Sequence, residues 1–496
     1  MELITWVALC LLMVVSVTYL INRGSSRYRL PPGPQGLPFI GCPWALFSEF
    51  HVLCTSMAET WGDVVSINIM GKTIVALNSA SVVREAFNSQ AFAETFAGRE
   101  PMPNYNKYVS HMTSFLQPGP VWYKLRKIVH KTLNHYGEGL HESERTIQEE
   151  LTHVIETLEK AGKSVNMDEV LYPSLINIMT ILLKGRRYDY DSIVLENARF
   201  LDEVVAQVSS PANNFFLKLF PFLIKLNIGP GRLVQMELRA ERQFLTDYYE
   251  ESKATYSREV TRGMIDVLLR HQEEAGSSWM TDDNVKGTIQ EMITAGVMTT
   301  RGALYSFFLI ILHHPVVMAA IQNEVQAVVG ESRFPKLEDS SQMPYTNAAI
   351  LELLRYISHV PVGLPHQTTA DVTFHGYVIP KHTMVMYNAW CFHHDSRNWD
   401  DPWEFKPQRF LDTDGHLVSA DHPLRKNLMP FGLGRRSCPG EAFAKSRIFL
   451  YITTLLQRFH FTRDPTRPPR SCDPRTYRQG IVMSPYEYWV KITPRS

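Results

Sequence analysis

The sequence predicts a mostly α-helical α+β protein with small β-sheets, built as one large globular domain behind an N-terminal transmembrane helix. Three observations predict this class. Apolar residues recur at spacings of three and four through most of the chain, as amphipathic helices require. Two short stretches alternate apolar and polar residues, which is typical of strands. Residues 3–21 carry no charge and are long enough to cross a bilayer as one helix.

The first 22 residues predict a membrane anchor. Three arginines follow within residues 23–29, and the positive-inside rule then leaves the rest of the chain in the cytoplasm. A cleaved signal peptide is the competing interpretation, but Glu2 stands where a positive charge is expected and no small-x-small cleavage site follows. Residues 23–38, basic and rich in proline, predict a hinge before the globular part.

Residues 39–496 form one predicted domain, because they contain no internal repeat, low-complexity run or long linker. Alternation predicts a β-hairpin over residues 64–77 and a second strand pair over 372–388. Spacings of three and four predict a helix over 141–162. Residues 213–226 are apolar but too short to span a membrane, and a buried helix and an interfacial segment both fit them.

The longest predicted helix begins near Thr281 and Asp282, both good N-cap residues, and ends near His314, before Pro315. Some thirty residues rise roughly 45 Å, about the width of a domain of this size. The middle of this segment is apolar nearly all round. We therefore expect the helix to run through the core.

Composition excludes several classes of protein. The chain has 496 residues, with 50 basic and 50 acidic side chains, and a net charge of zero argues against a nucleic-acid-binding function. Hydrophobic residues at 45% and charged residues at 20% are ordinary for a globular enzyme and exclude general disorder. The six cysteines show no paired spacing, which predicts a reducing compartment.

One of these cysteines, Cys438, lies in the loop FGLGRRSCPG, residues 431–440. Arg435 and Arg436 stand beside it and a predicted helix starts just after it; positive charge and a helix N-terminus both lower the pKa of a thiol. The three glycines, including Gly440, allow tight bends that bring backbone N–H groups to the sulfur. The pattern indicates a thiolate that binds a metal, although a lone cysteine is more often a buried, inert one.

The spacing of Phe431, Gly434, Arg436, Cys438 and Gly440 resembles the signature of the cytochrome P450 family, the haem-thiolate monooxygenases. The resemblance extends over the whole chain and is greatest to the animal microsomal branch, which oxidises steroids and foreign compounds. It implies heme b as cofactor, with Cys438 as the axial ligand of the iron and Phe431, Arg436 and Gly440 among the residues that bind the cofactor.

On the predicted core helix, the hydroxyl of Thr299 can turn back to the carbonyl of Ala295, and Gly296 adds slack, so that a bend could open a notch. The resemblance makes these three residues the catalytic set that holds dioxygen and water. The family usually has Asp or Glu directly before the threonine, whereas this chain has Met298. We expect poor coupling of electron use to product, with a methionine that merely fills space as the alternative.

Trp122 and Arg126 lie one helical turn apart and can face one carboxylate. The resemblance implies that these two residues, with Arg99, His366 and Arg436, contact the haem propionates. It also implies a scaffold network made of Glu352, Arg355 and Arg409.

The resemblance implies that electrons come from NADPH through a reductase, with cytochrome b5 as a further partner. A basic face for docking is predicted from Lys124, Lys127, Lys131, Arg425, Lys426 and Arg435. The implied location is the endoplasmic reticulum membrane, with a single span and the catalytic domain on the cytoplasmic face.

The sequence does not select the lipophilic substrate, which is a steroid, a fatty acid or a xenobiotic. Pocket walls are predicted from residues 101–119, the helix near Ala295, residues 360–364, and the region around Ile481 and Val482. Two other functions fit the same loop. One is a haem-thiolate isomerase or dehydratase of lipid hydroperoxides or endoperoxides, and the other is a noncatalytic haem-binding sensor.

Overall fold

The computed structural model describes residues 29–495, with the exception of residues 38–39, 101–107, 139, 162–163, 210–212, 214–215, 218–219 and 275–277. The predicted anchor, most of the hinge and the first part of the predicted pocket loop therefore lie outside the described residues. The described chain forms two compact units. The prediction of one domain over 39–496 stays a prediction.

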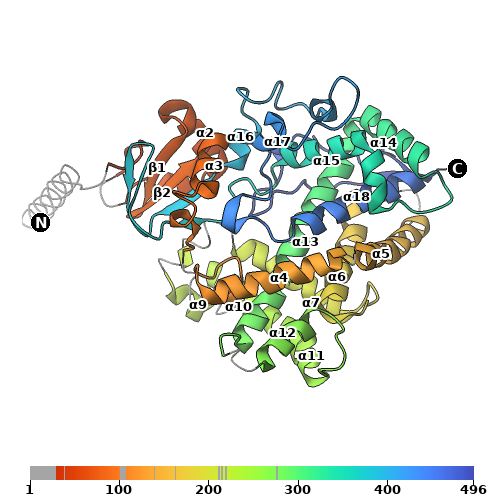
Figure 1. Ribbon diagram of the computed structural model, residues 1–496, viewed down its shortest axis with the longest axis horizontal. Coiled ribbons are helices and arrows are strands. Elements are labelled where there is room, and N and C mark those ends of the chain that lie inside the picture. Colours follow the sequence, from red (N-terminus) through yellow and green to blue (C-terminus); the bar gives the residue numbers. More distant parts are fainter. Residues whose placement is uncertain are drawn as a thin grey trace, which may run out of the picture. The chain divides into compact units, whose positions relative to one another are not determined.

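The first unit contains the chain up to residue 100 together with residues 362–392 and 433–436. Its strands form a four-stranded sheet in the order β1-β2-β7-β4 and a separate pair, β5-β6. Figure 1 shows β1 and β2 in red beside α2 and α3. Its elements are η1 (Pro43–Leu46), α2 (Phe50–Trp61), β1 (Val64–Ile69), β2 (Lys72–Leu77), α3 (Ala80–Asn88), η2 (Thr95–Ala97), β4 (His366–Gln367), β5 (Val372–Phe374), β6 (Tyr377–Ile379), β7 (Met384–Tyr387), the start of α16 (Ala389–His393) and η7 (Gly434–Arg436).

Both predicted strand pairs are confirmed. Strands β1 and β2 are antiparallel, and the two residues that join them, Met70 and Gly71, both have positive φ, at 51° and 81°. Two such residues make the turn whose twist matches that of a hairpin. Strands β5 and β6 are joined in the same way by His375 and Gly376.

The second unit contains residues 101–361, 393–432 and 437–496 and is predominantly helical. Its small sheet has the strand order β3-β9-β8. Its elements are η3 (Val109–His111), α4 (Pro120–Glu138), α5 (Leu140–Lys160), β3 (Ser164–Val165), α6 (Met167–Lys184), α7 (Ile193–Val208), α9 (Phe222–Leu226), α10 (Pro230–Leu245), the π-helix η4 (Thr246–Glu250), α11 (Glu251–Ala254), α12 (Met264–Glu273), α13 (Asp282–His313), α14 (Pro315–Val328), η5 (Leu337–Gln342), α15 (Pro344–Ile357), η6 (Pro407–Phe410), α17 (Pro423–Asn427), α18 (Glu441–Arg458), β8 (Phe459–Arg463), η8 (Pro474–Thr476) and β9 (Val490–Pro494).

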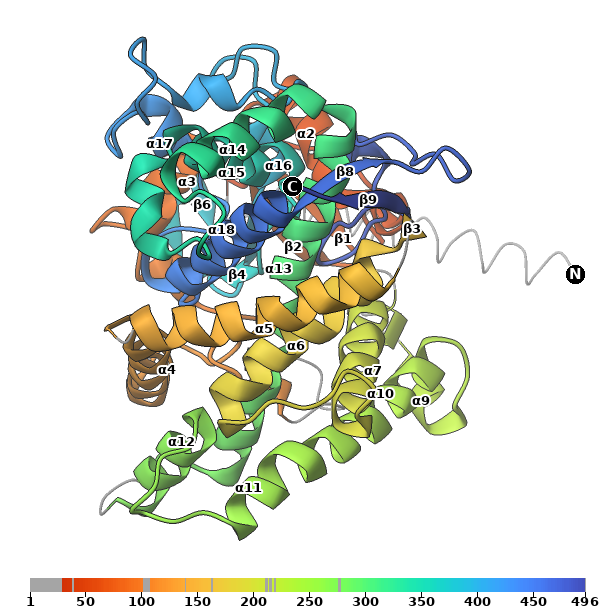
Figure 2. The ribbon, with the colours of Figure 1, turned by 90° about the vertical axis from the view of Figure 1, so that its right-hand side faces the viewer.

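Helix α13 is the predicted core helix, and its boundaries are confirmed. The Thr281 side chain accepts a hydrogen bond from the backbone N–H of Asn284, and the side-chain oxygen of Asn284 accepts one from the Thr281 N–H; this capping box starts the helix. Helices α6 and α18 pack against α13 (Figure 1, Figure 2). It is the one helix in the described part of the chain that is long and apolar enough to cross a membrane, yet 72% of its apolar window is buried inside the protein. It is therefore a core helix.

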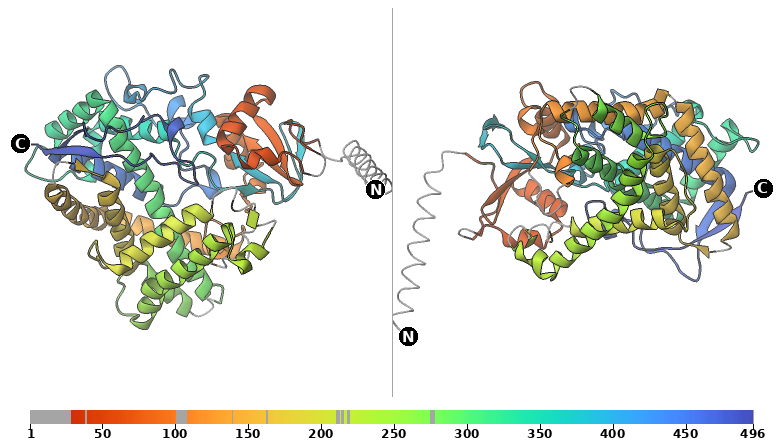
Figure 3. Two further views of the ribbon diagram at one scale, coloured as in Figure 1. Left: turned by 180° about the vertical axis from the view of Figure 1, so that it is seen from behind. Right: turned by 90° about the horizontal axis from the view of Figure 1, so that it is seen from below.

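Helices α7 and α10 pack along each other; Figure 3 shows them in yellow to green from two further sides. Their shared core consists of Val204, Val208, Leu217 and Val234. In the segment between them, Leu217 is buried in this core, whereas Phe222 and Leu226 of α9 are 52% and 59% exposed. The described part of residues 213–226 is therefore not buried throughout, and the interfacial interpretation stays a prediction.

Candidate active site

The loop around Cys438 is closed by its own backbone. The N–H of Cys438 donates to the carbonyl of Phe431 at 2.8 Å, and Gly432 has a φ of 69°, which only glycine adopts without strain. Gly440, which precedes α18, donates its N–H to the sulfur of Cys438. The sulfur thus lies at a helix N-terminus with a backbone donor on it, as the sequence predicts.

The two arginines of this loop form contacts that the sequence did not predict. Arg435 pairs with Glu94 at 2.5 Å, and Arg436 donates its Nε–H to the carbonyl of Ala97 at 2.9 Å. Both belong to the first unit, where Gly434 has a φ of 68° and a Cβ there would lie 1.9 Å from the Phe87 carbonyl oxygen. The arginines and the glycine fasten this turn within the first unit.

Burial by the surrounding protein is the largest influence on the pKa of the Cys438 thiol and raises it, while the Gly440 N–H and the Arg126 guanidinium lower it. The expectation that local positive charge lowers the pKa overall is therefore wrong for the protein alone. Cys438 is nevertheless exposed to solvent. A side chain that is desolvated by dense protein and still open to solvent lines a concave surface, and a metal ion bound there would itself deprotonate the thiol.

Arg126 is a cation whose charge lowers the pKa of this cysteine. Its guanidinium donates to the Ser437 carbonyl at 2.5 Å and lies over the ring of Trp122, 5.8 Å from the ring centroid. Trp122 is 1% exposed, and its indole N–H donates to the Thr113 carbonyl at 3.0 Å. The structure therefore brings Trp122 and Arg126 together, with the indole N–H already bound to the backbone.

In the first unit, Arg99 and His366 are buried side by side. Arg99 donates to two backbone carbonyl oxygens at 2.9 and 2.8 Å, and Nδ1 of His366 is 2.8 Å from the carbonyl oxygen of Phe96. Burial lowers the pKa of His366 well below its ordinary value, and the charges of Arg99 and Arg436 lower it further. Three of the predicted propionate contacts thus form one electropositive cluster.

Helix α13 is otherwise largely buried but is accessible to solvent at the predicted catalytic residues. Ala295 is exposed although the residues just before it and Val297 are buried, as expected of a core helix that borders an open cavity. The hydroxyl of Thr299 donates to the Ala295 carbonyl at 2.9 Å, which is the predicted back-bond. Gly296 has a different role from the slack expected of it, because a Cβ there would lie 2.7 Å from the methyl of Met179.

Three residues around this part of α13 were missed from the sequence. Glu291 accepts hydrogen bonds from the backbone N–H groups of Thr113 and Ser114, which ties the chain before α4 to α13. His359 is buried and bonds to the backbone of Thr299, and burial lowers its pKa to about 4. Arg447 of α18 donates to the Gly296 carbonyl at 2.9 Å. The only local signal for Arg447 is its position four residues from Phe443 and four from Tyr451, on the buried face of α18.

The predicted scaffold network is present. Glu352 accepts from Arg355 with both carboxylate oxygens, at 2.8 and 2.7 Å, and from Arg409 at 3.1 Å. Glu352 and Arg355 are completely buried. Their spacing of three does not form a surface pair here, because η6 and the chain before it cover them.

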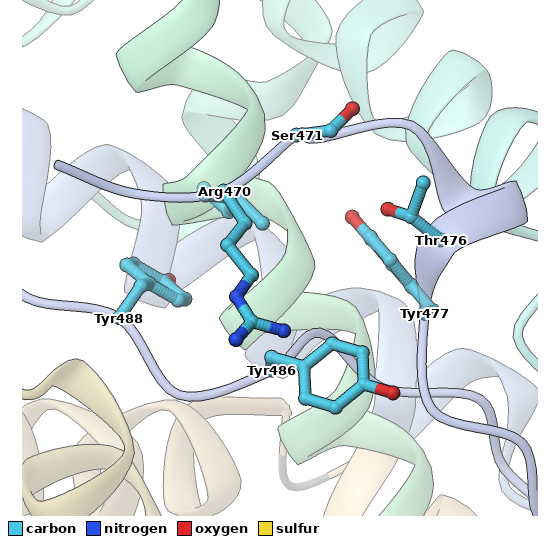
Figure 4. Close-up of a pocket in the computed structure, with 7 residues that line it drawn as sticks. Arg470, Ser471, Thr476, Tyr477, Tyr486 and Tyr488 are labelled. Carbon is cyan, nitrogen blue, oxygen red and sulfur yellow. The ribbon is translucent and has the colours of Figure 1, made fainter.

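A surface pocket of about 200 Å³ lies elsewhere in the second unit (Figure 4). It shares Leu309 with α13, fourteen residues beyond Ala295, which is roughly 20 Å along the helix. That separation excludes it as the space over the predicted catalytic residues. Its walls are Leu309, Arg470, Ser471, Thr476, Tyr477, Tyr486 and Tyr488.

A solvent-exposed cysteine at the start of α18 and a long core helix that is exposed at Ala295 are compatible with a haem-thiolate type of enzyme. The profile of the cytochrome P450 family matches residues 31–492. Cytochrome P450 2D27 of Mesocricetus auratus is 31% identical, over 96% of this chain and 95% of its own length. Cytochrome P450 2B4 of Oryctolagus cuniculus is 32% identical, over 98% and 99%.

A third relative, cytochrome P450 2U1 of Mus musculus, is 31% identical over 98% of this chain and 94% of its own. The chain belongs to the cytochrome P450 family, and it is an oxidoreductase of that family. The family implies haem iron, and the residues fit that group. Cys438 is open to solvent with a donor on its sulfur, and Arg447 has a buried Nε–H without a partner among the described residues.

Proposed function

We propose that this cytochrome P450 is a membrane-anchored haem-thiolate monooxygenase with Cys438 as the axial ligand of heme b. It inserts one atom of dioxygen into a lipophilic steroid, fatty acid or xenobiotic, with electrons from NADPH through a reductase. One observation carries the proposal. Within one unit, a cysteine that is desolvated yet open to solvent accompanies a core helix that is open at Ala295.

The protein's part at the sulfur is to fix and stabilise a negative charge. The Gly440 N–H and the N-terminus of α18 favour the thiolate, and the Phe431 carbonyl holds the cysteine backbone in place. Haem held by such a thiolate supplies the chemistry that cleaves the O–O bond.

Propionate binding requires fixed cations or donors. Arg126 is held at one place by the Ser437 carbonyl and by the face of the Trp122 ring. In the first unit, Arg99, His366 and Arg436 supply further donors and positive charge. Within each unit, these contacts hold donors or positive charge at fixed places, which suits a role in propionate binding.

Thr299 holds a water molecule that can supply the proton needed for oxygen cleavage. The Thr299 hydroxyl donates its hydrogen to the Ala295 carbonyl, so the hydroxyl oxygen remains able to accept a hydrogen bond from that water. Met298 is half-buried and brings no carboxylate to the opening. Proton delivery therefore depends on Thr299 and water alone among the predicted set, and slow delivery favours release of peroxide.

The reductase is expected to dock on α4. Lys124, Lys127 and Lys131 are exposed at spacings of three and four, and so share one face of that helix. An acidic partner would be steered toward such a face. Cytochrome b5, also acidic, is a second partner for this basic face.

Two apolar segments support a location at the endoplasmic reticulum membrane. Residues 3–21 have the length and composition of a single span, with the catalytic part on the cytoplasmic side. The side chains of Phe220, Phe222, Leu226 and Ile228 are 41%, 52%, 59% and 56% exposed, which suits contact with lipid.

The test is a reductase-supported screen of steroids, fatty acids and aromatic compounds, using the full chain in vesicles. The proposal predicts an NADPH-dependent oxygenated product that Cys438→Ser abolishes. Met298 favours one alternative, a haem-thiolate isomerase or dehydratase, which needs no proton relay. Conversion of a lipid hydroperoxide without NADPH, and no NADPH-dependent product, would establish that alternative. Haem binding without either product would indicate a sensor.

A further inference from the structure

Arg447 is a buried cation that pairs with no carboxylate in the described part of the chain. Arg447 belongs to α18 and is 2% exposed. Its guanidinium donates to the Gly296 carbonyl at 2.9 Å, contacts the sulfur of Met179 at 3.6 Å, and lies over the Phe443 ring, 4.4 Å from the centroid. Its Nε–H has no hydrogen-bond partner among the described residues.

Such a side chain is costly. Burial lowers the pKa of Arg447 to about 10, so it is still charged at neutral pH. A buried charge normally has an ion-pair partner, because an uncompensated one is strongly destabilising. A carbonyl, a thioether and a ring compensate a full charge only in part. The arrangement indicates that a negative charge forms near Arg447 when the protein binds its cofactor.

The groups around Arg447 identify where that charge would be. Two titratable groups interact with it, Tyr451 and Cys438. Burial raises the pKa of Tyr451, so its phenol stays neutral. Cys438 precedes the N-terminus of α18, and side chains on a helix lean toward its N-terminus, which directs Arg447 to the cysteine end. The Cys438 sulfur becomes an anion when it binds a metal.

We propose that Arg447 is a positioning residue that serves as the buried counter-cation of the Cys438 thiolate and holds the Gly296 carbonyl of α13. This inference rests on the proposed function, since it needs the thiolate to ligate haem iron. Reduction of the site adds one negative charge. A cation fixed nearby in a water-poor interior favours the reduced form, so Arg447 raises the reduction potential of the bound haem.

The experiment is a redox titration of the haem in the full-length protein and in three variants. Arg447→Met removes the charge and keeps an apolar side chain of similar length. Arg447→Gln removes the charge but keeps an N–H donor for the Gly296 carbonyl. Arg458→Met removes the same charge from an exposed position at the other end of α18 and serves as the control.

We expect both Arg447 variants to lower the equilibrium constant for reduction about tenfold, which is about 59 mV for one electron. The control should leave it unchanged. Unchanged potentials in both Arg447 variants, or an equal shift in all three, would overturn the inference. The wild-type ferrous–carbon monoxide spectrum separates this from failure of the proposed function. A thiolate-type band with unchanged potentials contradicts only the role of Arg447, whereas its absence contradicts the ligation itself.

Discussion

Two buried arginines of the second unit differ in one respect. Arg355 is completely buried, and its N–H groups donate to both Glu352 oxygens and to three backbone carbonyls, at 2.7–3.3 Å. Arg447 is buried almost as deeply, but over the described residues it donates to one carbonyl and to no carboxylate. The first arginine is satisfied within the protein, and the second is not.

The difference separates a scaffold from a site. A saturated pair such as Glu352 and Arg355 fixes η6 against α15 and gains nothing further from a ligand. An unsaturated cation between the cysteine helix and the core helix has capacity left for a charge supplied later. In this protein the paired arginine holds the scaffold together, and the arginine without a carboxylate among the described residues is the candidate for a functional role.

The largest effect is expected at the scaffold. Arg355→Met leaves Glu352 buried with one remaining ion-pair partner, Arg409, and we expect the free energy of unfolding to fall by about 3–5 kcal/mol. Urea unfolding followed by tryptophan fluorescence measures this loss.

The matched change at the other arginine sharpens the comparison. Arg447→Met removes a buried charge that has no carboxylate partner among the described residues, so the same urea titration of the apoprotein should give unchanged or higher stability. Equal losses for Arg355→Met and Arg447→Met would break the distinction between the two arginines.

The next effect concerns pH. Burial lowers the pKa of His359 and of His51 from 6.5 to about 4, so the folded protein binds fewer protons than the unfolded chain between these values. Stability therefore falls as the pH drops below about 6.5, by about 3 kcal/mol for each histidine once the pH reaches 4. Unfolding curves from pH 7 to 4 measure the loss. His359→Leu should reduce the slope by one proton; an identical slope would contradict the neutral burial of His359.

A carboxylate next to Thr299 is expected to have a smaller effect. Met298→Glu adds a proton donor at the opening of α13, and we expect the ratio of peroxide to product to fall about tenfold. Peroxide and product are measured in the same reductase-supported reaction, with Met298→Leu as the matched control. A ratio that both variants leave unchanged would show that Met298 only fills space.

The smallest effect is expected on α4. Lys127→Glu together with Lys131→Glu should slow reduction by the reductase about threefold at low salt, and less at high salt, because surface charges are screened. Stopped-flow reduction at two salt concentrations measures it. Lys160→Glu, at the exposed end of α5, is the control and should not slow reduction.

The fold was largely predictable because its determinants are local. A capping box defines the start of α13 and Pro315 follows its end, and two-residue turns with positive φ define both hairpins. The cysteine loop was predictable for the same reason, since its glycines and its helix start are contiguous in sequence. Backbone geometry of this kind depends on neighbours along the chain.

The charges around the site were less predictable, because they depend on distant partners. Arg435 and Arg436 adjoin the cysteine in sequence, yet they bind Glu94 and the Ala97 carbonyl. Arg447 looks like an ordinary basic residue of α18, and only its place on the buried face distinguishes it. Sequence adjacency drew attention to Arg435 and Arg436, whereas Arg447 was not predicted.

The central claim is that Cys438 ligates haem iron as a thiolate, and the ferrous–carbon monoxide spectrum tests it most directly. The full-length wild-type protein should show the red-shifted Soret band of a thiolate-ligated haem, and Cys438→Ser should lose it. Cys472→Ser, at another free cysteine, is the control and should keep the band. A wild-type spectrum without that band, or a Cys438→Ser spectrum that retains it, would contradict the claim.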